Sequence, residues 1–252
     1  MINDNEIPKK EIFEKLVKCG WDKLTKEEKQ IIGKYKEHSC HVRQLATLFR
    51  CAGFGGNTIP VVGEDPKYQL NEPHWKLAKD KKLKKYPRKG DKLQDVTEKE
   101  FQLIRQQAAE GMKVFIDWYY NLCFIKHKDY CCYCGIKQKD LHIYFNDKNE
   151  QYKEARQRGK WLEVERLITA PKEKNLYCSD NCALACYICN NAKSDFISPE
   201  GFKPIAEGIN KFWQEKLKDN PKAVEDLKAF WGQQKDNKDI FKGGNVCRIW
   251  KN

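Results

Sequence analysis

Two pairs of cysteines in this chain have the spacing of a metal site. Two residues separate the cysteines within each pair, and a long insert separates the pairs; the four residues are Cys131, Cys134, Cys186 and Cys189. Thiolates bind zinc tetrahedrally at about 2.3 Å, and two tight Cys-x-x-Cys turns supply four ligands. Gly135 follows the first pair and suits the left-handed turn of a zinc-binding loop. The sequence therefore predicts one structural zinc site, with four buried free cysteines as the alternative.

The insert carries residues that could hold a second kind of cation. Residues 161–167 (WLEVERL) alternate in polarity as a β-strand does, which puts Glu163 and Glu165 on one face. A carboxylate there can bind a hard cation such as Mg²⁺. Asn190 directly follows the last cysteine, and we expect it to open a short helix that the zinc site fixes against the strand. Glu165 and the amide oxygen of Asn190 are the predicted Mg²⁺ ligands, and the solvated face of an ordinary strand is the alternative.

Two basic residues near these candidates could bind phosphate. Arg166 ends the expected strand, and its planar guanidinium suits a phosphodiester and the charge that develops on it. Lys193, in the expected short helix, is predicted to lie near phosphate as well. A salt bridge from Arg166 to Glu163 or Asp195 is the structural alternative.

The order of these residues resembles that of a known enzyme family. The chain contains C-x-x-C-G, a strand that ends in an acid and a basic residue, and then N-x-x-x-x-C-x-x-C-N-x-x-K. This pattern is similar to that of the ββα-metal (HNH) endonucleases. The resemblance implies that Glu165 is the first metal-binding acid, in place of the more usual aspartate, and that Asn181 is the central asparagine. It also matches Asn190 to the residue after the second zinc pair, and it puts Arg166 where most members have a histidine as general base.

The usual histidine after the acid is absent, because no histidine follows His142 in the sequence. This absence limits which members of the family the chain resembles. The PacI-like restriction endonucleases within the family also carry arginine after the acid, and they share a Phe-x-x-Trp-Tyr segment before the first cysteine pair. The matching segment here is FIDWY, Phe115 to Tyr119, and the similarity covers about residues 112 to 215. It implies that Tyr119 activates the attacking group in place of histidine. Core packing of Tyr119 on its helix is one alternative, and His142 as the base is another.

The charge of the chain favours a polyanionic partner. It has 48 Lys and Arg against 36 Asp and Glu, a formal net charge of +12, and a basic excess of this size favours nucleic acid. The lysine-rich stretch at residues 73–95 also contains aromatic residues and is interpreted as a DNA-contacting arm. A solvated linker is the alternative for the stretch, and a generally Lys-rich surface is the alternative for the whole chain. The candidate contacts are Lys81, Lys82, Lys84, Lys85 and Arg88.

Export and membrane signals are not visible in the sequence. The first residues are polar, and no apolar run reaches the length of about 18 residues that suggests a membrane span. We therefore expect a cytoplasmic protein without a membrane partner, whose twelve cysteines stay reduced. Two looser groups, Cys178 with Cys182 and Cys40 with His41 and Cys51, are interpreted as ordinary buried residues rather than a second zinc site.

Local signals place helices on both sides of the predicted metal sites. Residues 1 to about 60 have apolar residues at helical spacing, and Thr97 with Glu100 forms a capping box for a helix that extends to Leu122. Ser198 with Pro199 and Asn220 with Pro221 begin two further helices. The expected apolar face of the first of these consists of Ile205, Ile209, Phe212 and Trp213.

These features together predict an α+β fold, with helices around a ββα-metal nuclease core that contains a four-cysteine zinc site. The expected regions are 1–95 for DNA recognition or dimerisation, 96–218 for the nuclease, and 219–252 as a helical extension. The resemblance implies a sequence-specific double-strand DNA endonuclease of the type II restriction class, with structural Zn²⁺ and catalytic Mg²⁺. A homodimer would match palindromic DNA. A homing or phage nicking endonuclease and a catalytically silent zinc-stabilised nucleic-acid-binding protein are the alternatives.

Overall fold

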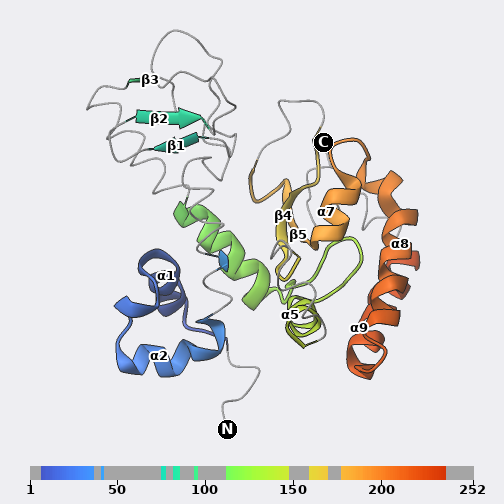
Figure 1. Ribbon diagram of the computed structural model, residues 1–252, viewed down its shortest axis with the longest axis horizontal. Coiled ribbons are helices and arrows are strands. Elements are labelled where there is room, and N and C mark those ends of the chain that lie inside the picture. Colours follow the sequence, from blue (N-terminus) through green and yellow to red (C-terminus); the bar gives the residue numbers. More distant parts are fainter. Residues whose placement is uncertain are drawn as a thin grey trace. The chain divides into compact units, whose positions relative to one another are not determined.

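The computed structural model of the protein describes residues 7–36, 41–42, 75–77, 82–85, 94–95, 112–147, 159–169 and 177–236. The chain divides into two compact units (Figure 1). One contains Met1–His127 and Tyr177–Ser179, and the other contains Lys128–Leu176 and Asp180–Asn252. The boundary at His127 lies within the region 96–218 that the sequence suggested as one domain. Among the described residues, no helix combines the length and apolar character that a membrane span requires.

The first unit begins with two short helices, α1 (Lys10–Cys19) and α2 (Lys26–Ile32). A 3₁₀ turn, η1 (Trp21–Lys23), lies between them, and a second, η2 (Gly33–Tyr35), follows α2. Helix α2 begins at a capping box, in which the Thr25 hydroxyl accepts from the Glu28 N–H and the Glu28 carboxylate accepts from the Thr25 N–H. Lys15 of α1 contacts the same glutamate at 2.7 Å. The helical prediction for the N-terminal region is thus confirmed for these residues.

A third helical segment of this unit covers residues 112–120 and continues into a π-helix, η3 (Asn121–Ile125). It packs on α1 through aromatic rings, with the Phe13 and Phe124 centroids 5.2 Å apart. The Tyr120 hydroxyl donates to the Pro8 carbonyl at 2.6 Å, and Lys10 pairs with Asp117 at 2.9 Å. The expected helix is confirmed here, whereas its predicted capping box at residues 97–100 lies outside the described residues.

The lysine-rich stretch contains three strands that the sequence did not predict. Strands β1 (Trp75–Leu77), β2 (Lys82–Lys85) and β3 (Gln94–Asp95) form an antiparallel sheet in the order β1-β2-β3 (Figure 1). Its register pairs Lys76 with Lys84 and Lys82 with Asp95. Part of the stretch therefore forms sheet, and Lys82, Lys84 and Lys85 of the predicted DNA contacts belong to β2. Lys81 and Arg88 lie outside the described residues.

The second unit contains a small antiparallel sheet of β4 (Glu163–Arg166) and β5 (Cys182–Ala185), followed directly by helix α7 (Tyr187–Lys193). In the register of β4 and β5, Glu165 is paired with Ala183. The loop that carries the first cysteine pair joins β5 through a hydrogen bond from the Cys132 N–H to the Leu184 carbonyl, at 2.8 Å. The predicted strand around Glu165 is confirmed.

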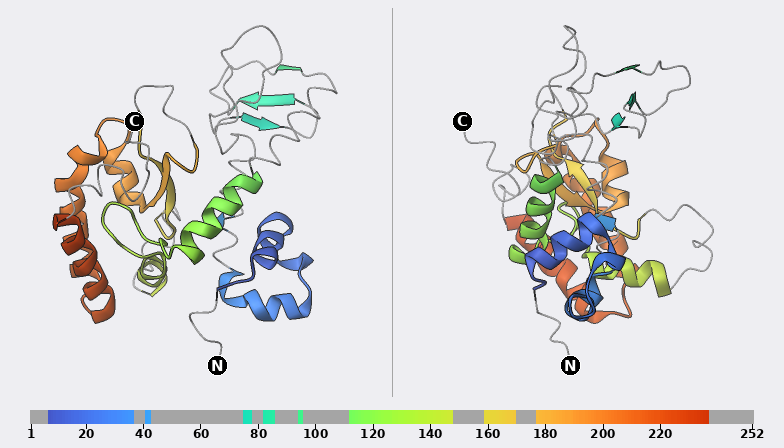
Figure 2. Two further views of the ribbon diagram at one scale, coloured as in Figure 1. Left: turned by 180° about the vertical axis from the view of Figure 1, so that it is seen from behind. Right: turned by 90° about the vertical axis from the view of Figure 1, so that its left-hand side faces the viewer.

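Three further helices belong to this unit: α5 (Gln138–Asp147), α8 (Pro199–Lys216) and α9 (Pro221–Asp236). Helices α8 and α9 run beside each other in both views (Figures 1 and 2). The predicted starts are confirmed, because the Ser198 hydroxyl accepts from the Gly201 N–H and the Asn220 side chain accepts from the Ala223 N–H.

The buried face of α8 differs from the predicted one. The buried residues are Phe202, Ala206, Asn210 and Trp213. Ile205 and Phe212 are instead 42% and 40% exposed. Two specific contacts orient the helix: Phe202 packs edge-on against Tyr133, and the Asn210 amide donates to the Cys134 carbonyl at 2.8 Å. The buried face of α8 therefore includes Asn210, a polar residue that is hydrogen-bonded to the cysteine loop. Apolar periodicity alone had predicted isoleucine and phenylalanine on this face.

Candidate metal centre and adjoining carboxylate site

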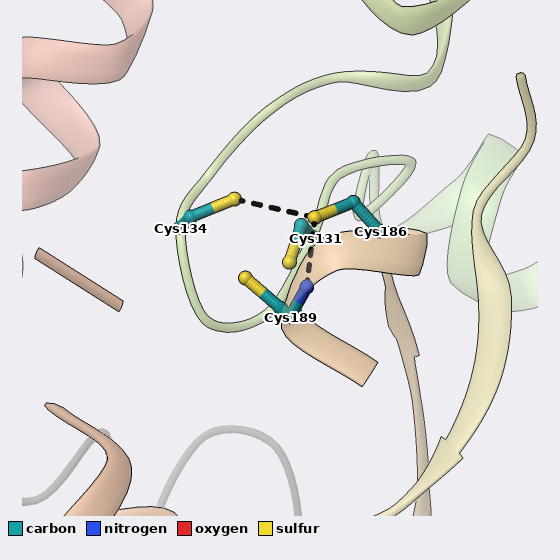
Figure 3. A group of neighbouring side chains, drawn as sticks. All are labelled: Cys131, Cys134, Cys186 and Cys189. Atoms are coloured by element: carbon teal, nitrogen blue, oxygen red, sulfur yellow. Dashed lines mark hydrogen bonds between the residues drawn. The ribbon is translucent and has the colours of Figure 1, made fainter. Parts of the chain in front are cut away.

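The sulfur atoms of the two cysteine pairs meet inside the second unit (Figure 3). All four Sγ atoms lie within 4.8 Å of one another, and all four residues are buried. Cys134 and Cys186 are 3.7 Å apart at sulfur. This arrangement is compatible with one tetrahedral zinc ion. Within the described ranges it is the one cluster of this kind, and Cys40 and Cys51 of the looser groups lie outside those ranges.

Local backbone geometry holds each pair in place. In the first pair, the Gly135 N–H donates to the Cys131 carbonyl at 2.9 Å, and Gly135 has φ of +79°, the left-handed turn that the sequence predicted. In the second pair, Cys186 is the N-cap of α7, and its sulfur accepts from the Cys189 N–H. The cysteine pairs therefore fix the start of α7 relative to the preceding loop.

Helix α7 begins earlier than the sequence suggested. Asn190 was expected to open it, but the helix starts at Tyr187, so Asn190 lies at its middle. The thiol of Cys186 explains the earlier start, because as N-cap it accepts from a backbone N–H of the first turn. Asn190 is thereby placed on a formed helix, one turn after the N-cap Cys186 and directly after Cys189.

One face of α7 covers the acidic face of β4. The Asn190 amide donates to a Glu163 carboxylate oxygen at 2.6 Å, and the Lys193 ammonium lies 2.9 Å from Oε1 of Glu165. The spacing explains the match, because side chains two apart on a strand and three apart on a helix each lie on one face. Glu163 and Glu165 thus share a face as predicted, but that face is packed against a helix rather than open to solvent.

Glu165 is enclosed and neutralised within the protein. It is only 5% exposed, and its Oε1 accepts from the Tyr133 hydroxyl at 3.1 Å as well as from Lys193. Burial raises the pKa of Glu165, and the charge and hydrogen bond of Lys193 only partly offset this. Burial also raises the pKa of Tyr133 far above its usual range, so that its hydroxyl remains a neutral donor.

Lys193 occupies a different place from the one expected of a phosphate-binding residue. Its side chain is fully buried, and its ammonium also donates to the Ser194 carbonyl at 3.1 Å. Ser194 ends α7 with φ of +51°, a left-handed value that is uncommon for serine. The ammonium therefore faces a carboxylate and a carbonyl instead of solvent. A buried ion pair explains this position better than contact with a polyanion does.

Asn181 is hydrogen-bonded to the backbone that directly follows β4. Its side-chain oxygen accepts from the Ile168 N–H at 2.8 Å, its amide donates to the Ile168 carbonyl at 3.0 Å, and it is 2% exposed. Its backbone carbonyl accepts from the Leu167 N–H. These bonds make Asn181 a positioning residue. Arg166, half-buried at the end of β4, is paired in register with Cys182.

The two candidate bases lie in different units. Tyr119 belongs to the first unit, where it is fully buried and its ring centroid lies 5.9 Å from that of Phe115. His142 lies on α5 in the second unit, with its ring 5.0 Å from that of Trp161.

Sequence reasoning did not identify two partners of this site. Tyr133 donates to Glu165, and Glu163 anchors Asn190. The position of Tyr133 between two zinc-site cysteines is a signal that could have found it, because a tight loop turns the intervening side chains toward the adjoining sheet.

Comparisons with known proteins give no identification: no protein family, no curated protein and no solved structure matches this chain.

Proposed function

We propose that this protein is a ββα-metal endonuclease that cleaves double-stranded DNA with a divalent cation, in the manner of a type II restriction enzyme. The observation that carries the proposal is the buried carboxylate of Glu165 on β4, beneath a helix whose start is tied to four clustered cysteines. Two antiparallel strands followed by a helix, with an acid on the first strand and an asparagine on the helix, support the proposal because they resemble the arrangement expected of this class of nuclease.

The oxygen atoms of the site fit a hard cation. Both contacts described for the Glu165 carboxylate fall on Oε1, which leaves Oε2 as a ligand atom. Asn190 is held through its amide nitrogen by Glu163, so its amide oxygen is the remaining group. Carboxylate and amide oxygens are ligands that Mg²⁺ accepts, and Mg²⁺ completes its shell with water and substrate phosphate. Glu165 and Asn190 are therefore the residues that would hold it.

Each residue then has a distinct part in phosphodiester hydrolysis. A bound Mg²⁺ supplies Lewis-acid stabilisation of the charge that develops on the phosphate. Arg166 orients the scissile phosphate with its planar guanidinium. Asn181 keeps the end of β4 in place through the Ile168 backbone. Tyr119 is assigned the activation of the attacking water; because a neutral phenol cannot accept a proton, this role requires its enclosed hydroxyl to ionise and to become accessible when DNA binds.

The net charge of +12 supports a DNA substrate, since a basic surface concentrates a polyanion. The proposed form on DNA is a homodimer, because a two-fold protein matches a palindromic site. A cytoplasmic location is part of the same proposal.

The direct test uses zinc-loaded protein with phage genomic DNA, in the presence and absence of Mg²⁺, followed by sequencing of fragment ends. We expect double-strand cuts at fixed sites only when Mg²⁺ is present. Glu165→Gln and Asn190→Ala should each slow cleavage by at least about 100-fold while zinc content and DNA binding persist. Glu200→Gln, which changes an exposed glutamate on α8, is the matched control and should cut normally. A near-normal rate for Glu165→Gln would show that the metal-site assignment is wrong.

One observation favours a second function. Because Lys193 already neutralises Glu165, the site could be catalytically silent, in a protein that only binds nucleic acid. Salt-sensitive DNA binding without any cuts, at every Mg²⁺ concentration, would support that function. Nicks in place of double-strand cuts would instead indicate a nicking enzyme.

A further inference from the structure

We infer that Lys193 is an internal counter-ion that makes cation binding at Glu165 depend on the phosphate of the bound substrate. The inference rests on the proposed function and adds a regulatory property to it: the catalytic cation enters together with DNA and is not held beforehand. The inference is based on the Lys193–Glu165 ion pair, which lies where α7 packs on β4.

The ion pair is built into the protein interior. The Lys193 side chain is 0% exposed and that of Glu165 is 6% exposed, with 2.9 Å between the ammonium and Oε1. Surface lysines can turn away into water, but a buried ammonium that loses its partner is left unpaired in the protein interior, which is strongly unfavourable. The Ser194 carbonyl, presented by a residue with left-handed φ, holds the ammonium from a second side. Lys193 therefore remains next to Glu165 when a cation approaches.

The Glu165 carboxylate already has its balancing charge. The Lys193 ammonium pairs with it directly, and Glu163, the other acid on this face of β4, accepts a hydrogen bond from the Asn190 amide. The thiolate cluster also acts on Glu165, but the effect of Cys131 is smaller than that of Lys193. A divalent cation here would meet a carboxylate that is already neutralised, with an ammonium nearby. Repulsion between like charges at this range is substantial in a partly buried site.

A phosphodiester changes this balance. It brings one negative charge and oxygen atoms that Mg²⁺ accepts readily as ligands. Bound DNA should therefore strengthen cation binding, and by linkage the cation should strengthen DNA binding by the same factor. The expected consequence for the enzyme is a site that holds little cation when no DNA is bound.

The experiment measures Mn²⁺ binding by electron paramagnetic resonance, on full-length zinc-loaded protein. Mn²⁺ is titrated alone and then with a duplex of the cleaved sequence that carries non-cleavable phosphorothioate linkages. Glu165→Gln defines the signal that does not belong to this site. In the wild-type protein we expect the duplex to tighten Mn²⁺ binding by at least about 10-fold, which is within the usual range of coupling between two sites.

The variant Lys193→Met removes the ammonium and keeps an unbranched side chain of similar length. It should bind Mn²⁺ about 10-fold more tightly than wild type without DNA, and the effect of the duplex should fall to a few-fold. Lys211→Met, at an exposed lysine of α8, removes the same charge away from the site and should behave as wild type. If Lys193→Met does not fold, the wild-type Mn²⁺ titrations with and without the duplex still test the inference.

Two results would overturn the inference. One is wild-type Mn²⁺ binding that is equally tight with and without the duplex. The other is a folded Lys193→Met variant whose Mn²⁺ affinity without DNA is unchanged. Either could occur in a protein that cuts DNA with Mg²⁺, so that the proposed function would stand while this inference fails. If no DNA is cut at all, the proposed function itself is wrong.

Discussion

Glu165 and Lys193 show how burial changes the role of a charged side chain. On a surface their attraction would be weak, because water and salt screen it. Here both are enclosed, with Tyr133 as a neutral donor to the same carboxylate oxygen. A buried pair of this kind is costly to form and costly to break. Lys193 and Asn190 lie on the same helix, so this pair and the Asn190–Glu163 hydrogen bond together hold α7 on β4.

The residue-scale prediction concerns the base. Tyr119→Phe keeps the ring and its packing against Phe115 and removes only the hydroxyl, so we expect a stable protein that binds DNA and cuts at least about 100-fold more slowly. Gel-based single-turnover cleavage measures the effect. The matched control is Tyr120→Phe in the same helix. Its hydroxyl donates to Pro8, so its loss should cost about 1 kcal/mol of stability but leave cleavage unchanged.

His142→Ala should reduce cleavage only mildly. A fully active Tyr119→Phe together with an inactive His142→Ala would mean that the histidine is the base and that the tyrosine has a packing role.

At the scale of elements, the four-cysteine cluster connects the loop of the first pair with β5, α7 and α8. The first pair lies in a loop that bonds to β5 and to α8, and the second pair begins α7. A zinc ion at the cluster would thus hold the loop, the sheet and two helices together. Since such sites rarely form before folding, the free energy of zinc binding contributes directly to folding.

Removing one ligand tests this coupling. Cys134→Ser should lose zinc and lower the midpoint of thermal unfolding strongly, or leave the protein insoluble. Cys132→Ser is the matched control, because this half-buried cysteine lies beside the cluster but is not one of its four members. It should retain about one zinc per chain by elemental analysis. Active protein that contains no zinc would contradict the assignment.

The loop geometry predicts a second effect on stability. Gly135 has φ of +79°, and a Cβ there would lie 2.4 Å from the ring of Phe230 on α9. Gly135→Ala should therefore lower the free energy of unfolding by at least about 1–2 kcal/mol, from backbone strain alone. Gly208→Ala, in the middle of α8 with open space around it, should instead stabilise by about 0.5–1 kcal/mol. Urea unfolding of both variants provides the comparison, and equal stabilities would show that the loop has another conformation in solution.

At the scale of the whole molecule, positive charge is distributed unevenly along the sequence. Several exposed lysines of α8 and α9 already pair with nearby carboxylates, such as Lys211 with Glu207 and Lys222 with Glu225. The lysine-rich stretch around β2 is the strongest local concentration of positive charge in the sequence. We therefore expect this stretch, rather than the C-terminal helices, to supply most of the electrostatic attraction for DNA.

Salt dependence tests this expectation. Each phosphate contact contributes about 0.9 to the slope of log affinity against log salt concentration. Replacing Lys81, Lys82, Lys84 and Lys85 together by glutamine should weaken binding to all sequences alike and flatten the slope. The control changes four exposed lysines of the C-terminal region to glutamine: Lys211, Lys218, Lys222 and Lys228. Equal effects of the two sets would mean that only net charge matters.

The sequence by itself determined the features that depend on neighbouring residues. The capping hydrogen bonds at Ser198 and Asn220 each join residues three positions apart, so a local pattern is enough to predict them. The left-handed turn at Gly135 follows from glycine's lack of a Cβ. The two Cys-x-x-Cys pairs are just as specific, because few other arrangements use thiolates at that spacing.

Only the tertiary structure decided what surrounds the reactive groups. Polarity alone cannot show that α7 covers the acidic face of β4, and that packing turns Lys193 from an expected phosphate contact into the buried partner of Glu165. The buried face of α8 was likewise set by Asn210, whose amide reaches the cysteine loop from far along the chain. In both cases a polar side chain is buried because a partner distant in sequence satisfies it, and burial without that partner would cost too much.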